Sequence, residues 1–143
     1  MVIKKKTERG AALIESAITI PIILLVSVSI FDFGRAYQAW QVLTNAAREG
    51  ARVSIIAGKT DDQVRDAVTL YVQGGGLAVD AEHPLSVNLE RGIEFGSNNA
   101  SRITVNYGFK FIVLGPVMRM VTSTSTQENA LTMGAVAVMR NEN

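Results

Sequence analysis

The chain of 143 residues contains no cysteine and a single histidine, His83. The lack of cysteine excludes disulfides, thiol catalysis, a lipid-modified cysteine and any cysteine-based zinc or iron–sulfur site. A lone histidine excludes a multi-histidine metal centre and leaves little for acid–base chemistry. We therefore expect neither a metal site nor a cofactor site.

The sequence also has no large excess of charge of one sign, because it contains 14 Lys and Arg and 13 Asp and Glu, which gives a net charge of +1. A nucleic-acid-binding protein with a dominant basic surface is therefore not expected. The charge is unevenly placed: residues 1–10, MVIKKKTERG, carry +3, and the remaining residues carry −2. With 48% hydrophobic residues the chain is too apolar to be disordered, and its length fits one small domain with an appendage.

The segment 11–31, AALIESAITIPIILLVSVSIF, has Glu15 as its only charged residue. A membrane-spanning helix needs about 20 mostly apolar residues, so this segment predicts one. A buried core helix would need a larger domain around it. A secretory signal peptide would have a shorter apolar region of about 7–15 residues and a small-residue cleavage site after it. The basic leader 1–10 predicts a cytoplasmic N-terminus, with everything after Asp32 outside.

Residues 32–57 contain no proline and predict an amphipathic extension of the same helix. From 11 to 57 this helix would be about 70 Å long, although Gly34 and Gly50 would permit bends. Its apolar side chains recur at steps of three and four residues, and we expect them to hold the outer domain or neighbouring subunits. This stripe consists of Phe33, Ala36, Tyr37, Trp40, Leu43, Ala47 and Ala51. Tyr37 and Trp40 also lie where an aromatic belt at the membrane surface is expected.

Residues 58–143 predict a small outer α+β domain. Thr60 and Gln63 have the spacing of a capping box at the start of a short helix, and the glycines 74–76 would end it. Apolar and polar residues alternate in segments 85–90 and 102–109, and a third candidate strand covers 130–140, where Gly134 leaves the register open. The residues between the last two predicted strands, Ile112 to Asn129, are predicted to form a linker. We expect an antiparallel sheet of three or four strands.

The junction between leader and apolar segment reads Arg9-Gly10-Ala11-Ala12-Leu13-Ile14-Glu15, the pattern of a type III (prepilin) signal. Gly10 allows the backbone to lie extended against a peptidase, and a cut after it frees the amine of Ala11. The Glu15 carboxylate would cost roughly 2.5–3.5 kcal/mol at mid-membrane. Pairing with an Ala11 amine, its own or a neighbour's, would offset that cost. Alternatively, Glu15 simply lies at the interface and extends into water.

Residues 9–52 resemble the TadE-like family of the tight-adherence (Tad, or Flp) pilus assembly systems. The last 40 residues or so resemble the ends of such proteins less specifically. Ser16 stands where the family usually has an aromatic or bulky apolar residue. The elements that carry the resemblance are Arg9 to Glu15, Pro21, Asp32-Phe33-Gly34-Arg35 and Asn45 to Arg52.

The resemblance implies a pseudopilin or minor pilin that is not an enzyme and that a prepilin peptidase processes at the bond between Gly10 and Ala11. It implies a bacterial inner-membrane location and a role in building an adhesive pilus. It also implies a major pilin, a sister pseudopilin and an inner-membrane platform as partners, besides the lipid bilayer. Glu15 would aid recognition and helix packing. Pro21 would loosen the membrane helix locally, a weak point for pulling the helix out of lipid into a filament. The alternatives are a membrane-anchored extracytoplasmic binding or enzymatic domain with an uncleaved leader, and the main filament subunit, against which the shorter length of typical Flp pilins counts.

Overall fold

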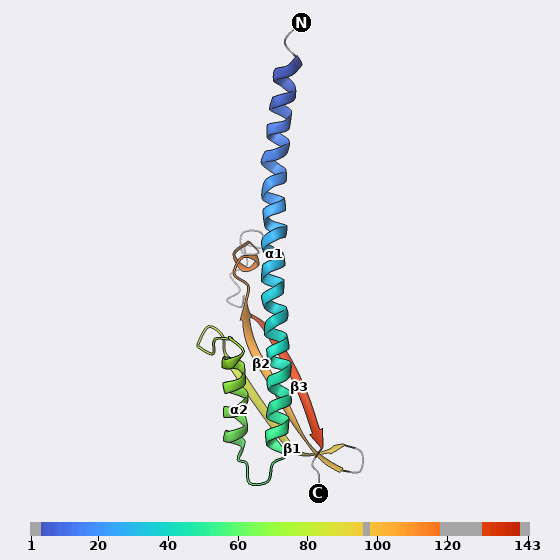
Figure 1. Cartoon of the computed structure of the whole chain (residues 1–143), viewed down its shortest axis with the longest axis vertical. Coiled ribbons are helices and arrows are strands. Elements are labelled where there is room, and N and C mark those ends of the chain that lie inside the picture. Colours follow the sequence, from blue (N-terminus) through green and yellow to red (C-terminus); the bar gives the residue numbers. More distant parts are fainter. Residues whose placement is uncertain (1–3, 96–97, 118–129, 141–143) are drawn as a thin grey trace.

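The protein consists of two helices and a three-stranded sheet, as described by a computed structural model for residues 4–95, 98–117 and 130–140. The N-terminal half of the first helix projects alone, and all other elements gather around its C-terminal half (Figure 1). This confirms the predicted α+β architecture. The start of the leader and the polar part of the linker lie outside the described residues. In chain order the elements are α1 (Lys4–Ser54), α2 (Asp61–Gly74), β1 (Leu85–Phe95), β2 (Asn98–Lys110) and β3 (Ala130–Arg140).

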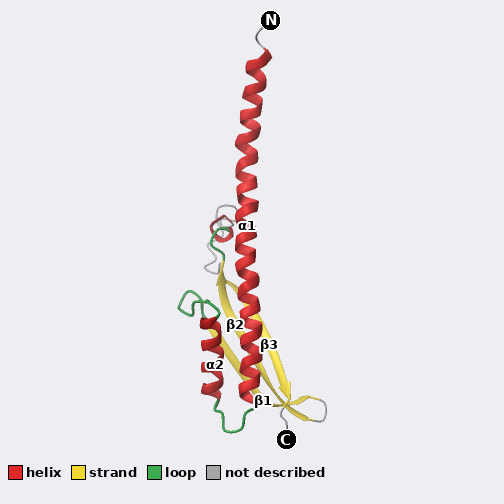
Figure 2. Cartoon of the chain, viewed as in Figure 1, coloured by secondary structure: helices red, strands yellow, loops and turns green. Residues whose placement is uncertain are grey.

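Helix α1 has 51 residues, which corresponds to about 75 Å at 1.5 Å per residue. It starts before the expected Ala11 and ends at Ser54, short of the expected Ala57. At this end the Ser54 hydroxyl donates to the carbonyl of Ala51 at 2.7 Å. Gly58, with φ +81°, then turns the chain toward α2. The ribbon is otherwise unbroken along its length (Figure 2).

Helix α2 begins with the predicted capping box. The Gln63 backbone N–H donates to the Thr60 hydroxyl at 3.3 Å, and the Thr60 N–H donates to the Gln63 side-chain oxygen at 3.4 Å. The helix ends at the expected glycines, where Gly76 has φ +81°. One face is completely buried through Val64, Val68 and Val72. The sequence pattern therefore predicted both ends of this helix correctly.

The sheet is antiparallel in the order β1-β2-β3. Both β1 and β2 extend beyond the predicted segments 85–90 and 102–109. A bulge between Glu90 and Ile93, with Gly92 at φ +70°, lets β1 continue past the point where its alternation ends. The third strand covers the predicted residues, and Gly134 pairs with Asn106 in an unbroken register.

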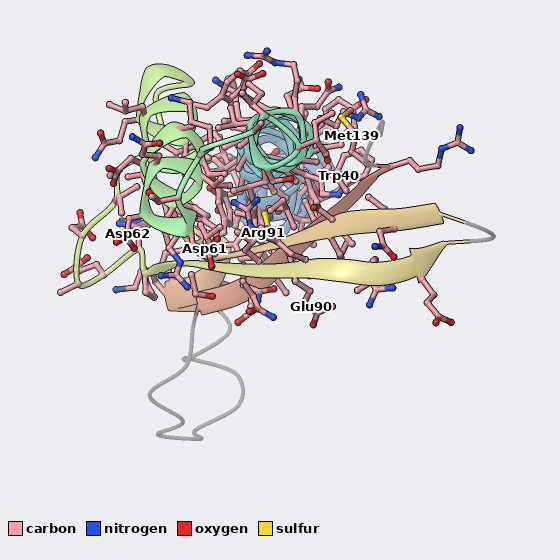
Figure 3. All side chains as sticks on the ribbon, turned by 90° about the horizontal axis from the view of Figure 1, so that it is seen from below. Trp40, Asp61, Asp62, Glu90, Arg91 and Met139 are labelled. Carbon is pink, nitrogen blue, oxygen red and sulfur yellow. The ribbon has the colours of Figure 1, made fainter. Side chains whose placement is uncertain are left out.

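Both helices pack on the same face of the sheet (Figure 3). Where α1, α2 and β2 meet, Gly50 is required for close approach. A Cβ atom there would lie 2.5 Å from Cγ2 of Val68 and 3.3 Å from Cγ2 of Ile103. The rest of α1's inner face is lined by small residues around Leu43, which lets the sheet approach the helix closely. These fully or almost fully buried alanines are Ala39, Ala46, Ala47 and Ala51.

Candidate functional site

The N-terminal part of α1 presents an uncovered apolar surface. Within the described part of the chain, Gly10–Ser54 is the one helix long and apolar enough to cross a membrane, and none of its most apolar stretch is buried. Side chains such as Leu13 (71% exposed) and Ile30 (67% exposed) point away from the rest of the protein. The helix is thus compatible with single-pass anchoring in a bilayer, since lipid would cover what the fold leaves open.

Three serines in this segment have their hydroxyl groups satisfied by the helix itself. Ser16, Ser27 and Ser29 each donate to the carbonyl four residues earlier, at 2.8, 2.8 and 2.7 Å. In hydrocarbon an unsatisfied hydroxyl would cost several kcal/mol. The serines that make the segment less apolar than most are therefore compatible with a position in lipid.

The predicted processing residues lie on the exposed, free end of α1. Gly10, Ala11 and Glu15 are all exposed, and a Cβ at position 10 would meet nothing within 4 Å. The backbone at Gly10 is helical. A peptidase that binds extended chain would have to unwind the helix here, and a glycine lowers the cost of doing so.

Pro21 lies inside α1 and is exposed. Because proline has no backbone N–H, the carbonyl of Ala17 lacks its intrahelical donor. The helix nevertheless continues through this position. The expected weak point is thus a missing hydrogen bond within a continuous helix.

The predicted apolar stripe of α1 divides into a buried part and an exposed part. Leu43 and Ala47 are completely buried against the domain. Phe33 and Tyr37 are 63% and 60% exposed, and Trp40 is 49% exposed. The rings of Tyr37 and Trp40 lie 6.0 Å apart on this outer surface. The domain therefore covers Leu43 and Ala47 and leaves the aromatic side chains of the stripe exposed.

The junction between anchor and domain is built on Asp32, which is only 2% exposed. Its carboxylate accepts hydrogen bonds from the backbone N–H groups of Ile112 (3.3 Å), Val113 (2.9 Å) and Leu114 (3.0 Å). Burial raises the pKa of Asp32, but these three donors and the nearby Arg35 lower it more, so the pKa lies below the ordinary value of 3.8. Asp32 is therefore held as a carboxylate at the point where α1 enters the domain.

An aromatic cluster surrounds this junction. The Arg35 guanidinium lies 3.6 Å from the Asp32 carboxylate and 5.3 Å from the centre of the Phe109 ring. Phe111 makes edge-to-face contacts with Phe109 at 5.2 Å and with Phe33 at 6.1 Å between ring centres. The Asp-Phe-Gly-Arg step of α1 thus contacts the end of β2 and the segment that follows it. Sequence reasoning singled out this step but could not find its partner some 80 residues away.

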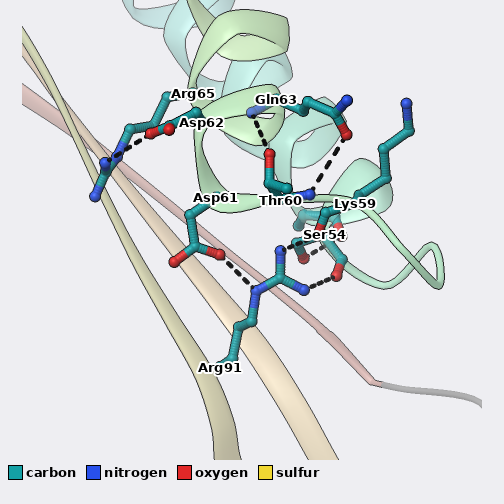
Figure 4. Close-up of polar contacts among 9 residues, drawn as sticks. Ser54, Lys59, Thr60, Asp61, Asp62, Gln63, Arg65 and Arg91 are labelled. Atoms are coloured by element: carbon teal, nitrogen blue, oxygen red, sulfur yellow. Dashed lines mark hydrogen bonds and ion pairs between the residues drawn. The ribbon is translucent and has the colours of Figure 1, made fainter.

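A second junction holds the other end of α1. Arg91, in the β1 bulge, donates to the carbonyls of Ser54 (2.7 Å) and Lys59 (3.1 Å) and to the carboxylate of Asp61 (2.9 Å) (Figure 4). One guanidinium therefore caps α1 and ties it to the start of α2. Sequence reasoning missed this residue, because it lies beyond the end of the predicted strand.

A groove of about 630 Å³ runs between α1 and α2. Its described lining consists of amides, tyrosines, a valine and glycines, with no carboxylate, histidine or lysine among them. Among the residues that the structure describes, no group of three or more His, Cys, Asp or Glu could hold a metal ion. The groove has the character of a contact surface. Its lining residues are Tyr37, Gln38, Gln41, Val42, Asn45, Tyr71, Gly74 and Gly75.

Comparison with known protein families points to the first helix. The model of a family described as TadE-like protein matches residues 10–52. This confirms the resemblance inferred from residues 9–52, and the match ends two residues before the end of α1. No curated protein and no solved structure matches the chain.

Proposed function

We propose that this chain, whose first helix is TadE-like, is a pseudopilin or minor pilin that acts in the assembly of a Tad (Flp) pilus. The observation that carries the proposal is the TadE-like match over residues 10–52, which suggests a protein associated with the Tad pilus. The exposed apolar helix that bears one small domain at its far end supports it. We propose a structural rather than an enzymatic role, because the groove is lined by amides, tyrosines and small residues.

In this proposal the apolar segment 11–31 crosses the bacterial inner membrane. The leader 1–10, with its net charge of +3, stays in the cytoplasm, as the positive-inside bias predicts. The domain then lies on the periplasmic side, and Asp32 marks the outer membrane surface. The exposed aromatic residues Tyr37 and Trp40 face laterally from this level and are available for contact with the major pilin, a sister pseudopilin or the assembly platform.

A prepilin peptidase cuts the bond between Gly10 and Ala11 in this scheme. The free amine of Ala11 and the Glu15 carboxylate are then four residues apart, which places them on neighbouring turns of one helix face. The amine can pair with Glu15 of the same chain or of a neighbour. Either pairing offsets the cost of a carboxylate in lipid.

The test is the intact mass of the protein purified from native membranes. We expect a chain that begins at Ala11, and we expect Gly10→Val to accumulate with its leader attached. Gly34→Val is the matched control, because Gly34 is another glycine of α1 with open space around it. That variant should be cut normally. A wild-type chain that still begins at Met1 would contradict processing and favour a membrane-anchored binding or enzymatic domain.

A second measurement addresses the pilus. Deletion of the gene should abolish surface pili and adhesion, and wild-type protein should restore both. The uncut Gly10→Val protein should not restore them. Normal piliation in the deletion strain would contradict a role in assembly.

A further inference from the structure

The segment 111–117, Phe-Ile-Val-Leu-Gly-Pro-Val, carries no charge and returns from the end of β2 to α1. It lies beside α1 at the end of the sheet that faces the free half of the helix (Figure 1). The backbone N–H of Ile112 lies 3.3 Å from the carboxylate of Asp32, the residue directly after the apolar segment 11–31. The loop is therefore level with the point where the predicted membrane span ends.

Several backbone N–H groups of this loop have hydrogen-bond partners within the protein. The Asp32 carboxylate accepts from three successive N–H groups, those of Ile112, Val113 and Leu114. A loop can enter an environment poor in water only when its backbone groups have such partners. Residues 114–117 form one helical turn, in which the Val117 N–H donates to the Val113 carbonyl at 3.2 Å. These paired N–H groups prepare the loop for contact with the bilayer interface.

The side chains at this level are apolar and uncovered on both the loop and the helix. Ile112 is 64% exposed, and on α1 Phe31 and Phe33 are 76% and 63% exposed. Pro116 is also exposed. Arg35, one turn farther from the membrane span, has 45% of its side chain exposed, a position suited to lipid phosphate groups. The apolar surface of the loop is therefore continuous with the apolar surface of the predicted membrane span. The lipid that covers the span would cover the loop as well.

We propose that residues 111–117 form a membrane-seating loop that inserts Ile112 and Pro116 into the outer interface of the phospholipid bilayer beside α1. This inference rests on the membrane anchoring in the proposed function. A single helix would leave the domain free to rotate about the helix axis. A second lipid contact away from that axis fixes which face of the domain turns toward the membrane and which faces turn toward neighbouring subunits.

The absence of cysteine allows a direct test by site-specific labelling of the full chain. Ile112→Cys and Pro116→Cys are each labelled with the fluorophore NBD and reconstituted at low density into phosphatidylcholine–phosphatidylglycerol vesicles. Parallel vesicles contain lipids with a doxyl quencher on the upper acyl chain. Leu24→Cys, in the apolar segment, reports whether the helix is inserted. Ile56→Cys, an exposed position (42%) in the turn after α1, serves as the control far from the membrane.

We expect blue-shifted emission and strong doxyl quenching at 112 and 116, and neither effect at 56. Quenching at 24 but water-like emission at both 112 and 116 would overturn the loop insertion and leave the anchored protein standing. No quenching at 24 would overturn both proposals. A blue shift at 112 that depends on protein density and is insensitive to doxyl lipid would indicate a contact between copies, and would also overturn the insertion. Unchanged circular dichroism of each labelled variant checks that the fold is intact.

Discussion

The buried carboxylate of Asp32 allows a quantitative prediction about how the domain is held to the anchor. Replacement by asparagine preserves the size of the side chain but removes the charge that three backbone N–H groups share. A hydrogen bond to a charged group contributes about 1.5–3 kcal/mol, roughly twice a neutral one. The side-chain amide of the Asp32→Asn variant can accept through only one oxygen, so at least one buried N–H loses its partner. We expect the loop 111–117 to open more easily by about 1.5–3 kcal/mol.

Hydrogen exchange of the full chain in detergent micelles measures this opening locally. A change of about 1.5–3 kcal/mol corresponds to roughly 10- to 150-fold faster exchange, which should appear at the amides of Ile112, Val113 and Leu114. Amides of the β2 core should change far less, because their exchange follows larger openings. Asp66→Asn, at an exposed position of α2, is the matched control and should leave exchange unchanged. Equal acceleration throughout the protein, or none at 112–114, would refute the reasoning.

The same junction predicts a pH dependence with a definite sign. The pKa of Asp32 in the folded protein lies below its ordinary value of 3.8, because three backbone donors outweigh the effect of burial. A lowered pKa means that the stabilisation is complete above pH 3.8 and is lost as the pH falls through the lower folded-state value. After correction for intrinsic exchange rates, protection at 112–114 should be constant from about pH 7 to about pH 5. Protection should fall only below about pH 3.8, and this fall should be absent in the Asp32→Asn variant.

Three further substitutions test other parts of the fold. Gly50→Ala should lower the melting temperature, because overpacking against α2 costs about 1–3 kcal/mol and outweighs a helix-propensity gain of about 1 kcal/mol. Gly34→Ala, in open space, should raise it. Arg91→Ala should lower the free energy of unfolding, measured with denaturant, by about 1–2 kcal/mol. Arg91→Lys should be destabilised as well, because an ammonium group cannot reproduce the guanidinium's hydrogen bonds to Ser54, Lys59 and Asp61 together. Pro21→Ala should strengthen α1 and impair pilus assembly, so unchanged piliation would contradict a role for this weak point.

Local sequence patterns predicted the elements well where the determinants were local. The capping box at Thr60, the alternation in β2 and the apolar segment of α1 each depend on neighbouring residues, and all three elements formed, although α1 and β2 have other bounds than predicted. Of the predicted stripe on α1, Ala36, Leu43, Ala47 and Ala51 are buried against the domain. The sequence pattern did not indicate Ala39 and Ala46, which are also completely buried, because small side chains give a weak periodic signal.

The contacts that hold the domain to the anchor could not be predicted from the sequence, because each joins residues distant along the chain. Asp32 was recognised as part of a motif, but its donors come from residues 112–114. Arg91 lies in a bulge that extends β1 past its alternating pattern, and its acceptors are in α1, the following turn and α2. Both junctions use backbone groups as partners, and backbone groups leave no signature in a sequence.

The position of these two junctions bears on how the protein works. The TadE-like match over residues 10–52 covers most of α1, including the half that packs against the domain, and not only its apolar segment. Asp32 holds the domain at the end of the packed half of α1 that adjoins the apolar segment 11–31, and Arg91 holds it at the other end, with the buried alanines between them. No flexible linker separates anchor from domain, since α1 is continuous from Lys4 to Ser54. Any movement of the apolar segment of α1 along or around its axis must therefore move the sheet with it, as the proposed function would require of a subunit drawn from the membrane into a pilus.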